Sequence, residues 1–162
     1  MAETLSVTDM QPNKFEPKRG NRWVLCIEGI DAFLIKTAAR PKISIESIEI
    51  PWINHKRYLA GKSSFDEMSI TLYDAIAPSG AQQVMEWIRT HFESVSGRAG
   101  YADFYKRDIQ LKLLDGPGTT VELWDIKGAF ITSADFGGLD YASNDATEIS
   151  LGIRYDQAVL QF

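Results

Sequence analysis

One polar segment, residues 53–68 (INHKRYLAGKSSFDEM), holds most of the residue types in this sequence that could do chemistry. It contains a Gly-Lys-Ser at 61–63, as nucleotide-binding loops do. It also offers a histidine, two hydroxyls and two carboxylates: His55, Ser63, Ser64, Asp66 and Glu67. These types allow three interpretations, namely a phosphate-binding loop, a catalytic site, or a surface that binds another protein.

The nucleotide-binding interpretation fails on spacing. A phosphate-binding loop of the Walker type needs a glycine five residues before the glycine of Gly-Lys-Ser. Counting back from Gly61 gives Lys56. The motif should also open a helix whose N-terminus binds the phosphate, whereas the residues that follow Phe65 alternate as a strand does. We therefore predict no nucleotide site here.

Catalytic and metal-binding interpretations find little support. Ser63 or Ser64 could be combined with His55 and Asp66, but neither serine lies in the Gly-x-Ser-x-Gly turn that exposes a nucleophile. The only other histidine, His91, is distant in the sequence, and there is no His-x-x-x-His or cysteine partner for a metal site. We predict no catalytic residues, no metal and no cofactor.

Two pairs of carboxylates leave a hydrolase open as an alternative. Glu46 and Glu49 flank a bend in one predicted strand, and Glu122 and Asp125 do so in another. A glycoside hydrolase needs two carboxyl groups across a cleft. The chain lacks the size and the long loops of most such enzymes.

Composition describes one domain with a substantial core. The chain has 162 residues, 44% of them apolar, and a formal net charge of −5, so it lacks the basic excess of a nucleic-acid-binding protein. Cys26 is the only cysteine, which excludes an internal disulfide. Because Cys26 lies in the apolar run RWVLCIEG, we predict a buried thiol.

The first 20 residues differ from the rest. They are polar, include Pro12, Pro17 and Gly20, and have no apolar run typical of a signal peptide. No apolar run of about 18 residues occurs, so no membrane span is predicted. We predict an extended arm over residues 1–20, flexible in the monomer, and a single domain over residues 21–162.

The strands that position the polar segment start at residue 22. Residues 22–29 place Trp23, Leu25 and Ile27 on one face, and we predict a hairpin with residues 32–38 through a turn at 29–31. Residues 43–50 alternate with a change of phase between Ile45 and Ile48, which predicts a bulge or bend, and Pro51 should end this strand.

A clear strand and one helix follow. In residues 65–74, Met68, Ile70 and Leu72 share one face. Ser79 is the expected N-cap of the helix, with Gln82 completing a capping box. Apolar residues then recur at helical spacing up to Gly97, the expected C-cap: Val84, Ile88, Phe92 and Val95, with Trp87 beside them.

Three further stretches read as strands. Residues 107–115 alternate, 115–118 form a turn, 120–132 alternate with a phase change near Leu123–Trp124, 136–145 form a loop, and 147–162 form a last strand. The inward residues would be Ile109, Leu111, Leu113, Ile149, Leu151, Ile153 and Tyr155. The expected fold is mainly β with one helix: two packed antiparallel sheets, as a sandwich or a barrel-like pair, with the helix covering one opening.

The order of these segments resembles a known family. A bent strand ending in proline (KISIESIEIP) precedes a basic segment (NHKRYLAGKSS), a clean strand (FDEMSITLYD) and a helix with an internal tryptophan (AQQVMEWIRTHF). This resembles the tail tube protein of contractile-tailed bacteriophages, a family shared with the inner tubes of R-type pyocins and extracellular contractile injection systems. The resemblance covers residues 20–162, and its strongest motif is Asn54, Lys56, Arg57, Ala60, Gly61, Phe65 and Asp66.

The resemblance implies a structural role. Hexameric rings would stack into a hollow tube inside a contractile sheath, as the conduit for DNA ejection into the host. Implied partners are further copies of the chain, the sheath protein, baseplate and tail terminator proteins, and a tape measure protein in the lumen, with DNA as transient cargo and no membrane anchor. The implied location is the virion tail, assembled in the bacterial cytoplasm.

The resemblance also gives the polar segment a role, as a hairpin over residues 53–64 that binds a neighbouring subunit. Lys56 and Arg57 would pair with acidic groups, and Tyr58 and Leu59 would be buried. Whether the neighbour lies in the same ring or in the stacked ring stays open. The expected contact residues are Asn54, His55, Lys56, Arg57, Tyr58, Leu59, Gly61, Phe65 and Asp66.

A second implied surface is the channel wall. The polar faces of two strands would line it, with Glu67, Ser69, Thr71, Glu148, Ser150 and Arg154 as candidates. A net negative wall would repel phosphates and let DNA slide, although Arg154 opposes a purely acidic wall. Ordinary solvent exposure explains the same alternation equally well. A different class also stays open, a small β-sandwich ligand-binding module with Trp52 and Tyr58 as an aromatic platform.

Overall fold

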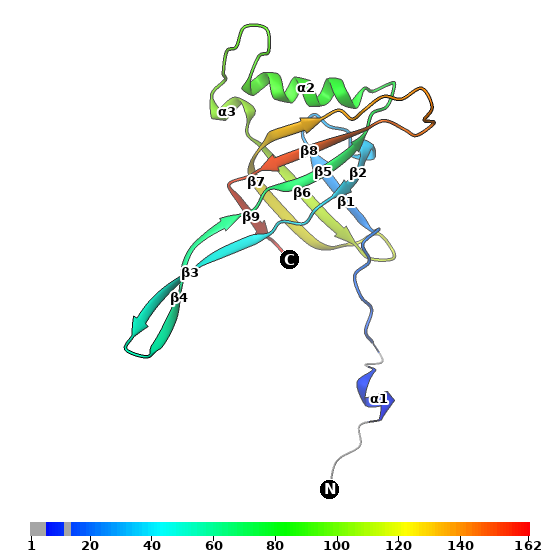
Figure 1. Cartoon of the computed structure of the whole chain (residues 1–162). Helices are drawn as coiled ribbons and strands as arrows, with labels where there is room; N and C mark the ends of the chain where they lie inside the picture. Colours follow the sequence, from blue (N-terminus) through cyan, green and yellow to red (C-terminus); the bar gives the residue numbers. More distant parts are fainter. Residues whose placement is uncertain (1–5, 12–13) are drawn as a thin grey trace.

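The computed structural model describes residues 6–11 and 14–162, which form one β-rich body with two projections (Figure 1). The body carries seven strands and the helix α2, and the projections are the N-terminal segment and a long hairpin. The strands are β1 (Trp23–Ile27), β2 (Ile35–Ala38), β3 (Ile43–Trp52), β4 (His55–Phe65), β5 (Met68–Tyr73), β6 (Arg107–Leu114), β7 (Thr120–Asp135), β8 (Glu148–Arg154) and β9 (Gln157–Leu160). The helices are α1 (Val7–Met10), α2 (Gly80–His91), α3 (Ala102–Tyr105) and the 3₁₀ turn η1 (Ala32–Leu34).

Two antiparallel sheets are present, as the sequence predicts. The larger has seven strands in the order β1-β6-β7-β8-β5-β2, with β9 also paired to β7, and the smaller is the β3–β4 hairpin. The 16-residue β7 pairs with β6 and β9 along its first part and with β8 along its second part. It therefore joins the two halves of the larger sheet, which pack on each other around one core.

The core consists of the inward faces that alternation identifies. Residues of β1 and β6 in one half meet residues of β5 and β8 in the other, and α2 adds Val84 and Trp87. Burial of these side chains is the main favourable term in folding. The predicted inward faces are confirmed at Leu25, Ile27, Met68, Ile70, Leu72, Ile109, Leu111, Leu113, Ile149, Leu151, Ile153 and Tyr155.

The helix begins where predicted but ends earlier. The Ser79 hydroxyl accepts a hydrogen bond from the Gln82 backbone N–H at 3.4 Å, as an N-cap does. The expected end at Gly97 is wrong, because the backbone is already extended at Phe92 and the chain turns back through a bridge between Phe92 and Ala99. Val95 is 96% exposed, so its helical spacing does not reflect a buried face.

The predicted hairpin between residues 22–29 and 32–38 is also wrong. β1 pairs with β6 and β2 pairs with β5, so the two strands belong to opposite halves of the sheet. The intervening η1 buries Leu34 and redirects the chain. Cys26 is exposed, contrary to the predicted buried thiol. The reason is the pleat, since Leu25 and Ile27 face the core and the residue between them must face outward.

Two details of the later strands differ from the sequence analysis. The predicted last strand is two strands, β8 and β9, separated at Asp156, and β9 pairs with β7 instead of extending β8. The phase change expected near Leu123–Trp124 is not a bulge: the irregularities of the β6–β7 ladder fall on either side of it. Glu122 occupies an inward position and is 6% exposed. A charged residue at an inward position interrupts the apolar alternation, and this is why the sequence predicts a change of phase.

The N-terminal segment contains the four-residue α1, which was not predicted. At its junction with the body, Lys18 forms an ion pair with Glu122, and Arg40 lies 3.7 Å from the same carboxylate. The Trp124 indole N–H donates to it at 2.5 Å. The hydrogen bond from Lys18 holds the pKa of Glu122 below its usual value, against the opposing effect of burial. No helix in the described part of the chain is long and apolar enough to cross a membrane.

Candidate assembly surfaces

The polar segment does not assemble a catalytic triad. Residue 53 belongs to the turn between β3 and β4, and residues 55–65 form β4 as one continuous strand. His55 lies at the tip of this hairpin, and the eight steps along the strand from His55 to Ser63 span roughly 26 Å at about 3.3 Å per step. Asp66 instead accepts a hydrogen bond from the Ser44 hydroxyl at 3.1 Å and pairs with Lys42 at 3.0 Å. These groups cannot act on one substrate atom.

Neither carboxylate pair faces a shared cleft. In each pair the two residues are three apart on a strand, which places them on opposite faces. Glu122 points inward to Lys18, whereas Asp125 accepts a hydrogen bond from the Gln161 side chain at 2.9 Å. Across residues 6–11 and 14–162, no group of three or more His, Cys, Asp or Glu side chains is arranged to hold a metal ion.

Gly61 has a packing role. It lies within β4, opposite the irregular part of β3, where the register shifts between Ile45 and Ser47. A Cβ at Gly61 would lie 3.1 Å from the Glu46 carbonyl oxygen and 3.3 Å from a side-chain carbon of Ile48. The glycine therefore allows the two strands to approach closely at the bulge, and the Gly-Lys-Ser sequence leads into more strand, not into a helix.

The predicted bulge exists, but its extra residue is on the other strand. Between the paired positions Ile45–Ser63 and Ser47–Ala60, β3 advances by two residues and β4 by three. The pleat of β3 is therefore uninterrupted. It follows that the isoleucines on either side of the phase change, Ile45 and Ile48, lie on opposite faces of the hairpin.

The strand extends slightly further than predicted. Pro51 pairs with Lys56 inside the hairpin, and β3 ends one residue later at Trp52. Trp52 shares a face with its partner His55, whereas Tyr58 shares the opposite face with Glu49. Trp52 and Tyr58 therefore form no common aromatic platform, which removes the feature that favoured a ligand-binding module.

The predicted contact residues divide into a tip and an anchor. At the tip, Lys56 pairs with Glu49 of its own hairpin at 2.7 Å but stays more than half exposed, so its contact with a neighbouring subunit stays a prediction. Arg57 has no ion-pair partner within the described residues and stays available. At the base, the Phe65 ring packs on Tyr155 at 5.7 Å between centroids, which joins the hairpin to the core.

Asp66 completes this anchor. The hydrogen bond from Lys42, followed by that from Ser44, lowers the pKa of Asp66. The Tyr155 hydroxyl accepts a hydrogen bond from the Lys42 backbone N–H at 3.3 Å, and burial raises the pKa of this phenol. The remaining predicted contact residues, Asn54, His55, Tyr58 and Leu59, are exposed at or near the tip.

The candidate channel residues come together on one outward face. β5 and β8 are adjacent, with Ser69 opposite Gly152, Thr71 opposite Ser150 and Tyr73 opposite Glu148. Because Met68, Ile70 and Leu72 face the core, the alternate residues of β5 face away from it. The same argument applies to β8. The structure therefore places Glu67, Ser69, Thr71, Glu148, Ser150 and Arg154 on one surface.

The outward face also includes β7, for which the sequence predicted no outward residues. Ser133 lies opposite Gly152 and Asp135 opposite Ser150, and these residues line a shallow groove with Glu67 and Ser69. The Thr132 hydroxyl donates to Glu67 at 2.5 Å. The predicted strand stopped at Thr132, but the small polar residues of 132–135 could have indicated that the same face continued.

Charges on this face are mixed. Lys36 of β2 pairs with Glu148, and this hydrogen bond raises the pKa of Lys36. Glu67 and Asp135 add negative charge, while Arg154 has no ion-pair partner within the described residues. The outward face of these strands is polar and slightly acidic.

Comparison with known proteins supports the tail-tube resemblance. No protein-family model matches the chain. It is 27% identical over 128 residues to the "Tail tube protein" of Serratia phage KSP90, which covers 78% of this chain and 72% of that protein. The resemblance that the sequence showed to phage tail tube proteins is thereby confirmed.

Solved structures show the same fold. One chain in the structure of the anti-feeding prophage tube terminating cap is 18% identical with a TM-score of 0.74, covering 97% of this chain and 99% of that one. Another, in the sheath–tube complex of the PVC extracellular contractile injection system in its extended state, is 18% identical with a TM-score of 0.71, covering 98% and 99%. The mainly β tail-tube fold is therefore confirmed.

Proposed function

We propose that this chain is the structural subunit of a phage tail tube, in which hexameric rings stack into a hollow tube inside a contractile sheath. The observation that carries the proposal is the four-stranded run β2–β5–β8–β7. Its inner face is apolar and buried, its outer face is polar and uncovered, and both of its edges are unpaired among the described residues.

The two edges are suited to join copies of the chain. β2 pairs only with β5, and residues 130–135 of β7 pair only with β8. Neighbouring strands in this run are all antiparallel, so β2 and β7 point in opposite directions. A β2 placed beside the β7 of another copy would continue the antiparallel pattern. Closing such a ring would remove the exposed edges that otherwise favour aggregation.

The outer face of this run would then line the channel. Its residues include Glu67, Ser69, Thr71, Glu148, Ser150 and Arg154, with Ser133 and Asp135 from β7. A polar and slightly acidic wall offers little to hold a polyphosphate, which suits a conduit for DNA. Tight DNA binding by assembled tubes at physiological salt would contradict this role for the wall.

The remaining segments would make the other contacts. The β3–β4 hairpin, with Asn54 to Leu59 near its tip, would bind neighbouring subunits. The segment 1–20, of which residues 1–5 and 12–13 lie outside the described residues, would be an arm that contacts other subunits on stacking, outside the domain 21–162. Sheath, baseplate and terminator proteins would be partners, since the similar chains occur in structures of those assemblies. A tape measure protein and then DNA would occupy the lumen, and assembly would take place in the host cytoplasm before incorporation into the virion.

This role includes no chemical step, and the geometry favours none. The related alternative is the inner tube of a pyocin or an extracellular contractile injection system, which the likeness to chains of such systems also supports. Both alternatives require the same rings and tubes and differ in what passes through the lumen.

Negative-stain electron microscopy of the concentrated, purified protein tests the proposal. We expect six-fold rings and hollow tubes. A protein that stays monomeric at high concentration, in light scattering as well as in micrographs, would overturn it. Deleting residues 54–63 should abolish assembly while the β-sheet signal in circular dichroism is retained, and tubes formed by this deletion would contradict the role of the hairpin.

A further inference from the structure

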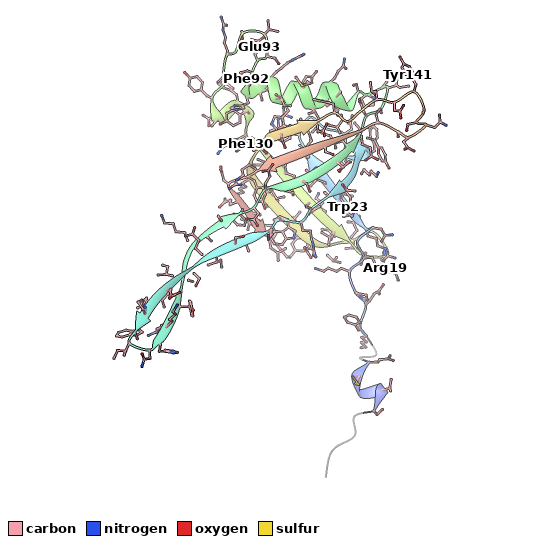
Figure 2. All side chains as sticks on the ribbon, viewed as in Figure 1. Arg19, Trp23, Phe92, Glu93, Phe130 and Tyr141 are labelled. Atoms are coloured by element: carbon pink, nitrogen blue, oxygen red, sulfur yellow. The ribbon has the colours of Figure 1, made fainter. Side chains whose placement is uncertain are left out.

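Residues 16–20, called the strap below, cross the end of the body opposite to α2 (Figure 1). Arg19 of the strap and Trp23 of β1 both lie at this end (Figure 2). A cavity of about 330 Å³ separates the strap from the body, and its floor includes Trp23, Leu111 and Leu113. Both leucines belong to the buried core. The strap therefore covers core side chains at one opening of the sandwich, as α2 does at the other.

One ion pair holds the strap on the body. Lys18 of the strap pairs with Glu122 of β7, and among the described residues this is the only ion pair that the strap forms. The Lys18 side chain is 51% exposed, whereas the Glu122 side chain is 7% exposed. The backbone adds one hydrogen bond, from the Arg22 N–H to the Arg19 carbonyl at 3.4 Å. Because an exposed lysine gains little from pairing in water, the burial of the carboxylate is what makes this contact matter.

The same carboxylate also contacts the chain just beyond the edge strand β2. Arg40, two residues after the end of β2, lies 3.7 Å from Glu122, and the Trp124 indole N–H donates to it at 2.5 Å. On the neighbouring strand β6, the residue opposite Glu122 is the apolar Leu113. Among the described residues, the charged groups that act on Glu122 are therefore two cations, Lys18 and Arg40, from two different segments.

Loss of the negative charge at Glu122 would reverse the balance at this end. Lys18 and Arg40 would remain close together without the anion between them, beside a cavity that Arg19 also lines. Release of the strap would return Lys18 to water and relieve this repulsion. The sheet would stay paired, because the strap belongs to none of its strands.

We propose that the strap is a latch and that Glu122 is its positioning residue. With Glu122 ionised, the strap is docked over the opening and Arg40 is held beside it. With Glu122 neutral, the strap is released, the cavity opens to solvent, and the chain after β2 loses its tie to β7. This device belongs to the single chain and does not depend on rings or tubes.

Limited trypsin digestion of the full-length, unassembled chain tests the proposal. A protease cleaves the bond after Arg19 in proportion to the population in which the strap is released. Cleavage after Lys14, which precedes the strap, is the internal reference. Glu122→Gln and Lys18→Gln remove the ion pair from its two sides. Glu16→Gln is the matched control, because it neutralises an exposed strap carboxylate that has no ion-pair partner in the described part of the chain.

We expect Glu122→Gln and Lys18→Gln each to accelerate cleavage after Arg19 by about tenfold relative to cleavage after Lys14. The double variant should be no faster than Glu122→Gln alone, because both substitutions remove the same contact. Circular dichroism should show unchanged sheet content in every variant. Lys18 is half exposed, so Lys18→Gln still decides the result if Glu122→Gln does not fold.

Hydrogen exchange at a series of pH values gives a readout that a contact independent of charge would not move. Ionised Glu122 is the state that docks the strap, and its pKa lies below the ordinary value of 4.5. Exchange in residues 16–22, corrected for the intrinsic rate, should therefore increase as the pH falls below 4.5 through that lowered pKa. In Glu122→Gln the corrected exchange should be fast and independent of pH.

Three results would overturn the proposal. One is cleavage after Arg19 at the unmodified rate in both Glu122→Gln and Lys18→Gln. Another is an equal acceleration by Glu16→Gln, which would mean that any change of strap charge has the same effect. The third is exchange in residues 16–22 that depends on pH as strongly in Glu122→Gln as in the unmodified chain.

Discussion

The body and the β3–β4 hairpin use the same alternating pattern with opposite results. In β5, the apolar residues Met68, Ile70 and Leu72 are fully buried. In β3, Ile43, Ile45 and Ile48 are about half exposed or more, although isoleucine also alternates there on either side of one change of phase. Figure 2 shows the contrast, with side chains crowded within the body and projecting freely from both sides of the hairpin.

The difference separates two uses of apolar side chains. In the body they meet side chains of another layer and stabilise the monomer. In the hairpin they meet nothing within the chain, so their contribution depends on another molecule. A soluble protein rarely exposes several large apolar residues together without an interface to cover them. The comparison predicts that substitutions in the body change folding, whereas those in the hairpin change assembly.

The largest effect is expected at Trp87, which joins α2 to the core. It is 1% exposed, its indole N–H donates to the Tyr105 carbonyl at 2.7 Å, and Arg107 lies over its ring. Trp87→Ala should reduce the free energy of unfolding by about 3–5 kcal/mol. Urea denaturation of the unassembled protein measures this. A loss below about 1 kcal/mol would mean that the body does not depend on this packing and would weaken the comparison.

A smaller effect is expected at Glu122, where the N-terminal segment meets the body. Glu122→Gln removes the negative charge that pairs with Lys18 and should lower the free energy of unfolding by about 1–2 kcal/mol near neutral pH. This effect lies in the lower part of the range for a buried charged group because its partner Lys18 is half exposed. The Gln side chain can still accept from the Trp124 indole.

This cost should depend on pH. The folded-state pKa of Glu122 is lowered from its ordinary value of 4.5, so the stabilisation is present above that value and is lost as the pH falls through the lowered pKa. The stabilities of the two proteins should therefore converge below pH 4.5. Thermal unfolding at a series of pH values tests this, and a difference that stayed constant down to low pH would contradict the role of the charge.

The helix N-cap should give a change of about 1 kcal/mol. Ser79→Ala removes the hydroxyl that accepts from the Gln82 N–H, which leaves an unpaired donor at the start of α2. Ser94→Ala, in the exposed turn after α2, is a suitable control because among the described residues its hydroxyl makes no hydrogen bond. Equal losses from the two substitutions, measured by urea denaturation, would show that the cap is not the cause.

The smallest change in monomer stability is expected in the hairpin. Ile48→Ser should alter the free energy of unfolding of the unassembled protein by no more than about 0.5 kcal/mol, although Ile48 is as large as the core isoleucines. The matched core substitution Ile70→Ser should cost several-fold more. If Ile48→Ser destabilised the monomer as much as Ile70→Ser, the hairpin would belong to the folding core and the contrast between the two regions would fail.

The local sequence pattern was sufficient to predict much of this fold. Alternation identified the inward faces of β5, β6 and β8, because a residue's face in a regular strand depends only on its position in the pleat. Ser79 was recognisable as an N-cap, because capping is a contact between residues three apart. The order of segments and the motif of residues 54–66 indicated the tail-tube resemblance, and spacing alone excluded a nucleotide site at Gly61.

What sequence could not supply were the choices that depend on distant partners. Whether β1 pairs with β2 or β6, where β8 ends and β9 begins, and how early α2 stops are decided by contacts between residues far apart in the chain. A buried Glu122 looked like a change of phase because its partner, Lys18, is 104 residues away. The phase change at Ile45–Ile48 was visible in the sequence, but which strand held the extra residue was not. Only the pairing of β3 with β4 decided that the isoleucines face opposite ways, because a face is a property of one strand and a bulge is a property of two.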